Sequence, residues 1–89
     1  MARANVDPTE LRRFAKDLAR FHHDLETMMG SLHARARELA TSWRDQEQRR
    51  FTGELEQAMR GLKRFLETSE EHAAFLNKKA GLVEDYLKR

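Results

Sequence analysis

Two long stretches of the sequence carry apolar residues at every third or fourth position, and a short segment without this period separates them. In the first stretch a leucine falls at every seventh position, and a second large apolar residue follows three positions after each of the first three leucines. This spacing places the side chains on one stripe of an α-helix. The stripe comprises Leu11, Leu18, Leu25, Leu32 and Leu39, with Phe14, Phe21 and Met28.

The second stretch has the same period and predicts a second amphipathic helix. In the first stretch Ala15, Met29 and Ala36 adjoin the stripe and make it broader than a two-stranded coiled coil requires, so the pattern favours a helical bundle. The stripe of the second stretch runs through Phe51, Leu55, Ala58, Leu62, Phe65, Ser69, His72, Leu76, Val83 and Tyr86.

Two aspartates mark the expected helix starts. Asp7 precedes Pro8, and an N-cap carboxylate followed by proline at the first helical position is typical of a helix N-terminus. Asp45 precedes Gln46-Glu47-Gln48 and offers a second N-cap with an acidic first turn. The sequence therefore predicts a first helix over about residues 8–41, a turn over about 42–45 and a second helix over about 46–87.

The expected fold is all-α, a single helical-hairpin domain over residues 1–89. Helices joined by so short a turn must be antiparallel neighbours. A two-helix chain of 89 residues buries little apolar surface, so we expect two hairpins to dimerise into a four-helix bundle. The residues assigned to the core of the hairpin and of its dimer are Leu11, Phe14, Leu18, Phe21, Leu25, Leu32, Leu39, Phe51, Leu55, Leu62, Phe65, Leu76 and Val83.

The charges favour a solvated protein surface and argue against a nucleic-acid-binding arm. Seventeen Lys and Arg residues face fifteen Asp and Glu residues, and the two signs alternate along the chain. Basic pairs such as Arg12-Arg13 and Lys78-Lys79 have acidic neighbours and no interleaved aromatic platform. No apolar run is long enough to span a bilayer, and the N-terminus lacks the apolar segment of a signal peptide.

The residues that could carry chemistry do not form a recognisable catalytic or metal-binding pattern. The sequence contains no cysteine, no glycine-rich phosphate loop and no nucleophile with a paired base. Helical di-iron sites use Glu-x-x-His, and none of the four histidines has a glutamate three residues before it. We therefore expect no enzyme activity, no metal and no cofactor, and we expect His72 to be a partly buried, hydrogen-bonded interruption of the second stripe.

The turn carries the most specific motif. A central Trp43 stands two residues before Asp45, with Phe51 eight positions after the tryptophan, between two long helices in a chain of near 100 residues. This pattern resembles the WXG family, with Asp45 in place of the family's glycine, a change that an N-cap position tolerates. The resemblance implies a non-enzymatic helical hairpin that dimerises, as a homodimer or with a related WXG-like protein, and serves bacterial type VII secretion as a substrate, adaptor or effector partner.

The resemblance also suggests recognition roles for Trp43, Asp45 and Tyr86. In the family an export signal places a tyrosine four residues before an acidic residue, and from Tyr86 that position falls beyond Arg89. We therefore expect a protein of the bacterial cytoplasm, or one exported without a cleaved signal peptide through a partner's signal. Trp43 is either a plug that closes the bundle or part of a recognition surface. The alternative function is a structural or regulatory coiled-coil adaptor unrelated to secretion.

Overall fold

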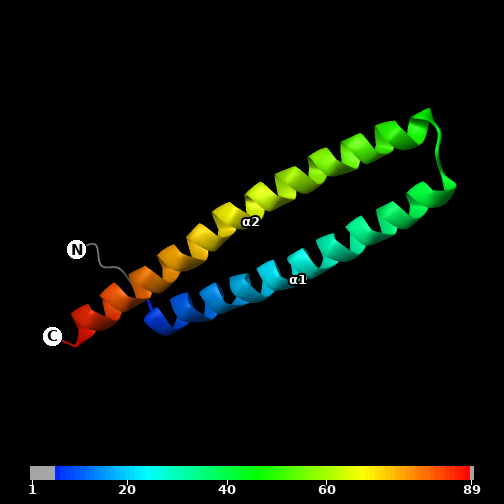
Figure 1. The fold of residues 1–89 in the computed structure, drawn as a ribbon. Helices are drawn as coiled ribbons and strands as arrows, with labels where there is room; N and C mark the ends of the chain where they lie inside the picture. Colours follow the sequence, from blue (N-terminus) through cyan, green and yellow to red (C-terminus); the bar gives the residue numbers. More distant parts are fainter. Residues whose placement is uncertain (1–5, 89) are drawn as a thin grey trace.

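The computed structural model describes residues 6–88 and consists of two antiparallel helices joined by a short turn (Figure 1). Helix α1 comprises Pro8–Ser42 and helix α2 comprises Gln46–Leu87. No strand occurs among the described residues, so the prediction of an all-α helical hairpin is confirmed. The expected domain of residues 1–89 extends at both ends beyond the described range.

Both helices begin at an aspartate that accepts a backbone hydrogen bond. The Thr9 N–H donates to the Asp7 carboxylate at 2.9 Å, and Pro8 occupies the first turn, where its missing N–H needs no partner. The Gln48 N–H donates to the Asp45 carboxylate at the same distance of 2.9 Å. These caps satisfy amides that the helix itself leaves free, and they fix where each helix starts.

The helices meet along a seam in which every second inner residue of the first half of α1 is a leucine. From Leu11 to Met29, the residues of α1 that turn toward α2 recur at alternating spacings of four and three. Three of them, Ala15, His22 and Met29, follow four residues after a leucine, whereas Phe14 and Phe21 follow after three and stay exposed. The inner stripe is therefore displaced by one position from the phenylalanines.

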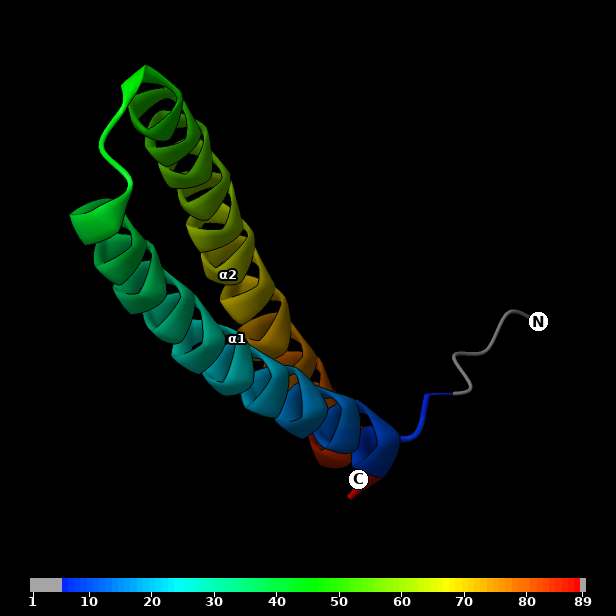
Figure 2. The ribbon, with the colours of Figure 1, turned by 90° about the vertical axis from the view of Figure 1, so that its right-hand side faces the viewer.

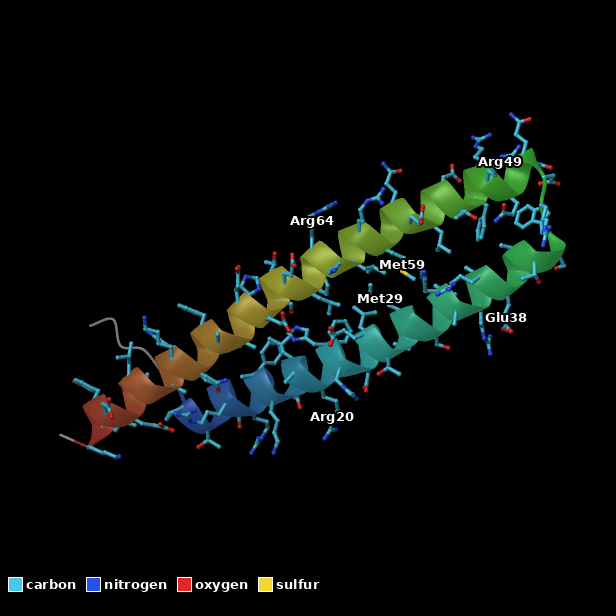
Figure 3. All side chains as sticks on the ribbon, viewed as in Figure 1. Arg20, Met29, Glu38, Arg49, Met59 and Arg64 are labelled. Atoms are coloured by element: carbon cyan, nitrogen blue, oxygen red, sulfur yellow. The ribbon has the colours of Figure 1, made fainter. Side chains whose placement is uncertain are left out.

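Packing is tightest in the half of the hairpin that contains the chain termini. Ala15 and His22 of α1 are buried there, as are three residues of α2, Leu66, Ser69 and Ala80. The helices separate toward the turn, and α1 bows away from α2 (Figures 1 and 2). Met29 and Met59 both point into the space between the helices, while Arg20 and Arg64 point away from it (Figure 3).

Candidate functional site

One flank of the hairpin carries large apolar side chains that the fold leaves open to solvent. Residues seven apart lie on nearly the same side of a helix, so Phe14, Phe21 and Met28 form a row beside the seam. Phe21 and Phe65 meet across the two helices edge to face, with ring centroids 6.2 Å apart. We call this surface the aromatic face; it comprises Phe14, Phe21 and Met28 of α1 with Phe51 and Phe65 of α2, together with the exposed leucines at its border with the seam, Leu32, Leu39 and Leu62.

The exposure of these side chains is large. Phe14 is 57% exposed and Phe21 is 47% exposed. Further along α2, Phe75, Leu82 and Tyr86 add more exposed apolar surface. An apolar area that spans most of the length of a small protein is typical of a protein–protein interface. The aromatic face is therefore the candidate functional site.

The structure divides the predicted core residues between the seam and the aromatic face. The side chains that turn toward the opposite helix are half-buried, and those on the aromatic face are exposed in the single hairpin. The half-buried group comprises Leu11, Leu18, Leu25, Leu55, Leu76 and Val83. The exposed group comprises Phe14, Phe21, Leu32, Leu39, Phe51, Leu62 and Phe65.

Trp43 lies at the turn and packs against the first turns of α2. Its indole is half-buried, and its ring centroid is 5.7 Å from that of Phe51, with the two planes tilted by 39°. The backbone N–H of Trp43 donates to the Leu39 carbonyl at 3.0 Å and closes the last turn of α1. Asp45 caps α2 two residues later, so the motif both ends one helix and begins the next.

Tyr86 is the third predicted recognition residue and lies far from the turn. It is in the penultimate position of α2, with 75% of its surface exposed. Because the helices are antiparallel, Trp43 and Tyr86 occupy opposite ends of one hairpin (Figure 1). The fold brings Trp43 and Asp45 together and does not bring Tyr86 to them.

The histidines differ from expectation. His72 is exposed in the hairpin, so the prediction that it is partly buried is wrong. The buried histidine is His22, which is 5% exposed and whose Nε2 has no hydrogen-bond partner among the described residues. His22 follows Leu18 by four residues, and this spacing is the sequence signal for a seam position. Because histidine is polar, it was not included in the predicted apolar stripe. Within residues 6–88, no three His, Asp or Glu side chains gather to hold a metal ion.

An ion pair joins the two helices on the other flank. The Arg12 guanidinium donates to the two carboxylate oxygens of Glu84, from Nε at 2.9 Å and from Nη2 at 2.7 Å. The hydrogen bond from Arg12 holds the pKa of Glu84 below its ordinary value, and the same contact raises the pKa of Arg12. This bidentate contact ties the first turns of α1 to the last turns of α2.

Comparison with protein families identifies the hairpin. The sequence model for proteins of 100 residues with WXG matches residues 3–86 of the chain. The chain belongs to the WXG100 family. WXG100 proteins are small, non-enzymatic helical proteins of type VII secretion, and they typically pair with partners in that system.

Three further observations complete the description of the chain. A search of curated proteins gave no match. No described helix of this WXG100 protein is both long and apolar enough to cross a membrane. In this family member the turn reads Trp43-Arg44-Asp45, and a side-chain cap stands where the family name prints a glycine.

Proposed function

We propose that this WXG100 protein acts in type VII secretion as a dimeric substrate, adaptor or effector partner whose mechanism is binding. The observation that carries the proposal is the aromatic face. Two hairpins that pack these faces together form a four-helix bundle, with Leu32, Leu39 and Leu62 beside the phenylalanines in its centre. The occupant of the face is a second copy or a related WXG100 protein.

The surface area of the hairpin supports dimerisation. A compact monomer of this mass exposes roughly 5,400 Å², whereas the hairpin exposes 7600 Å², about 40% more. The excess on one chain, roughly 2,200 Å², is larger than the roughly 800 Å² that each partner buries in a specific interface of standard size. A second hairpin on the aromatic face accounts for apolar surface that a single chain leaves in water.

Sedimentation equilibrium tests the dimer with one pair of matched variants. Phe21→Glu and Ala19→Glu each introduce a carboxylate at an exposed position of α1, but only the first lies on the aromatic face. The wild-type protein and Ala19→Glu should sediment as dimers, and Phe21→Glu should sediment as a monomer. If Phe21→Glu remains a homodimer, the aromatic face is not the interface.

The same sedimentation experiment distinguishes a heterodimer from a homodimer. If the wild-type chain is monomeric alone but dimeric after mixing with a WXG100 protein encoded beside it, the pairing is heterotypic. Phe21→Glu should then abolish that pairing as well. Monomeric behaviour with every such partner contradicts the proposed dimer.

Export tests the role of Trp43. When two hairpins pack antiparallel, the turn of one lies near the termini of the other, so Trp43 and the partner subunit's Tyr86 would form one composite recognition surface. We expect Trp43→Ala to lower the secreted fraction more strongly than it lowers the melting temperature of the dimer. Immunoblots of culture medium and a thermal melt measure the two quantities, and parallel losses mean that the indole acts only as a plug.

A further inference from the structure

We propose that the hairpin carries a second docking site, a groove near the turn that binds an acidic amphipathic helix of a partner protein. The groove lies between residues 33–40 of α1 and 48–60 of α2, and its volume is about 310 Å³. The two helices separate at this end of the hairpin (Figure 1). Below we call this site the turn groove. It is distinct from the aromatic face.

Small residues on one helix and flexible residues on the other create the turn groove. Ala36 and Ala40 contribute only methyl groups from α1, and Leu55 and Met59 line the opposite wall. A cavity of about 150 Å³ holds one benzene ring, so the turn groove has room for roughly two leucine-sized side chains. The thioether of Met59 adapts to different apolar shapes.

The polar residues beside this floor do not close it. The Gln48 side-chain amide donates to the Thr52 hydroxyl at 2.7 Å, a hydrogen bond within α2. Both side chains line the turn groove. This hydrogen bond holds the two side chains along α2, on one wall of the groove.

The turn groove opens on the flank opposite the aromatic face. Nine residues make two and a half helical turns, so Glu56 lies half a turn from Phe65 on α2, as Arg12 does from Phe21 on α1. Arg37 follows Arg12 by almost seven full turns and shares its side of α1. A second hairpin packed on the aromatic face therefore leaves the turn groove uncovered.

The charge at the rim selects an acidic partner. Arg37 and Arg60 stand on either side of the groove with His33 beside them, against a single carboxylate from Glu56. Among the described residues, neither arginine takes part in an ion pair. Two guanidinium groups that flank an apolar floor suit apolar side chains with carboxylates beside them.

The shape of the groove favours a helix as the occupant. Its walls are two antiparallel helices that diverge gradually, so a third helix laid along them packs by the same ridge-and-groove contacts that join α1 and α2. Apolar side chains one helical turn apart project from the same side of such a helix. They would enter the floor between Ala40 and Met59 while acidic residues reach Arg37 and Arg60.

Fluorescence polarisation with designed peptides tests this site. The probe is a labelled helix of roughly 18 residues, long enough to be partly helical alone, with two leucines four residues apart among alanine and glutamate. Its control replaces every glutamate with lysine. We expect the acidic peptide to bind at least about tenfold more tightly than the basic one, and equal affinities would overturn the proposal.

Variants locate the binding site. Ala40→Leu fills the floor and should weaken binding of the acidic peptide about tenfold, whereas Ala19→Leu on the same helix outside the groove should have no effect. The double variant Arg37→Glu, Arg60→Glu should bind the basic peptide in preference to the acidic one. Binding that Ala40→Leu leaves unchanged would place the peptide elsewhere and overturn the proposal.

Two further measurements separate this proposal from its alternatives. Phe21→Glu should retain peptide affinity while losing the dimer, so failure at one surface is distinguished from failure at the other. Co-sedimentation with vesicles of phosphatidylcholine and phosphatidylglycerol examines an anionic lipid as the occupant. Vesicle binding that Ala40→Leu abolishes, with no peptide binding, would assign the groove to lipid and overturn the protein partner.

Discussion

The two ends of the hairpin are built from the same two helices but pack differently. At the end with the chain termini, Ala15 and Ala80 are buried and the Arg12–Glu84 ion pair joins the helices. At the turn, the helices diverge and the turn groove opens between them. None of the five residues that the structure identifies as buried lies between His22 and Leu66.

This difference shows that small residues bring helices together only when the opposite helix presents a matching surface. Ala80 has no exposed surface, because the facing part of α1 closes over it. Ala40 is also a half-buried alanine, yet it lines an open groove whose opposite wall includes Gln48 and Thr52, which are hydrogen-bonded to each other. The termini end therefore holds the hairpin together, and the turn end is available for binding.

Truncating a leucine to alanine at each end should give the largest difference in the free energy of unfolding between the two ends. Leu66→Ala removes a buried side chain and should lower the free energy of unfolding by about 2–4 kcal/mol. Leu55→Ala removes a half-buried one beside the groove and should cost about 1 kcal/mol. Urea unfolding followed by circular dichroism, at one protein concentration because dimer stability depends on it, measures both. Equal losses would mean that the ends are packed equally well.

Replacing an alanine with leucine at each end tests the same difference by adding side-chain volume instead of removing it. Ala80→Leu forces extra methyl groups into a closed contact and should destabilise the fold by about 1–3 kcal/mol. The same replacement at Ala40 has the groove to occupy and should change stability by less than about 0.5 kcal/mol. Thermal melts of the two variants provide the comparison. A large loss in Ala40→Leu would show that the groove closes in solution.

The buried histidine predicts a substitution that stabilises the fold. The Nε2 of His22 is buried without a hydrogen-bond partner among the described residues, and such an atom costs about 1–3 kcal/mol. His22→Leu removes that cost at a similar side-chain volume and should raise the free energy of unfolding by about 1 kcal/mol. His23→Leu, at the neighbouring exposed position of α1, is the control. A destabilised His22→Leu would show that Nε2 finds a partner in solution.

The ion pair at the termini should have the smallest effect, because exposed pairs contribute little. Arg12→Ala should lower the melting temperature slightly at neutral pH. The folded pKa of Glu84 lies below its unfolded value, so this contribution is present above the ordinary carboxyl pKa of about 4.3 and disappears as pH falls through the lowered pKa. Melting curves of both proteins between neutral and acid pH should converge at low pH, and a constant difference would contradict the assignment.

Periodicity and caps were enough to predict the hairpin, but they could not identify its inner stripe. Each of the first leucines is followed by a phenylalanine or methionine three residues later and by Ala15, His22 or Met29 four residues later. Both rows adjoin the leucines, and hydrophobicity favours the phenylalanines. The fold places the row of Ala15, His22 and Met29 inside and leaves the phenylalanines exposed in the single hairpin. Sequence spacing alone does not contain that information.

The candidate site, like the fold, was predicted from the sequence only in part. Trp43 and Asp45 were identified because they interrupt the period. The residues of the aromatic face were predicted only as core, together with those of the seam, because both groups continue the apolar period. The turn groove depends on how far two helices diverge and on a hydrogen bond between Gln48 and Thr52. Neither property has a signature in the residue order, so the groove was found only in three dimensions.

The slenderness of the hairpin has a consequence for transport. Its backbone measures 66 × 21 × 14 Å, so its cross-section is little more than two helices side by side. A translocation channel needs to open only to that width, plus side chains, to admit the folded chain lengthwise. In the proposed dimer, a second hairpin on the aromatic face adds one helical layer of about 10 Å. For the export proposed above, the width of the conduit would then determine whether the hairpin passes paired or alone.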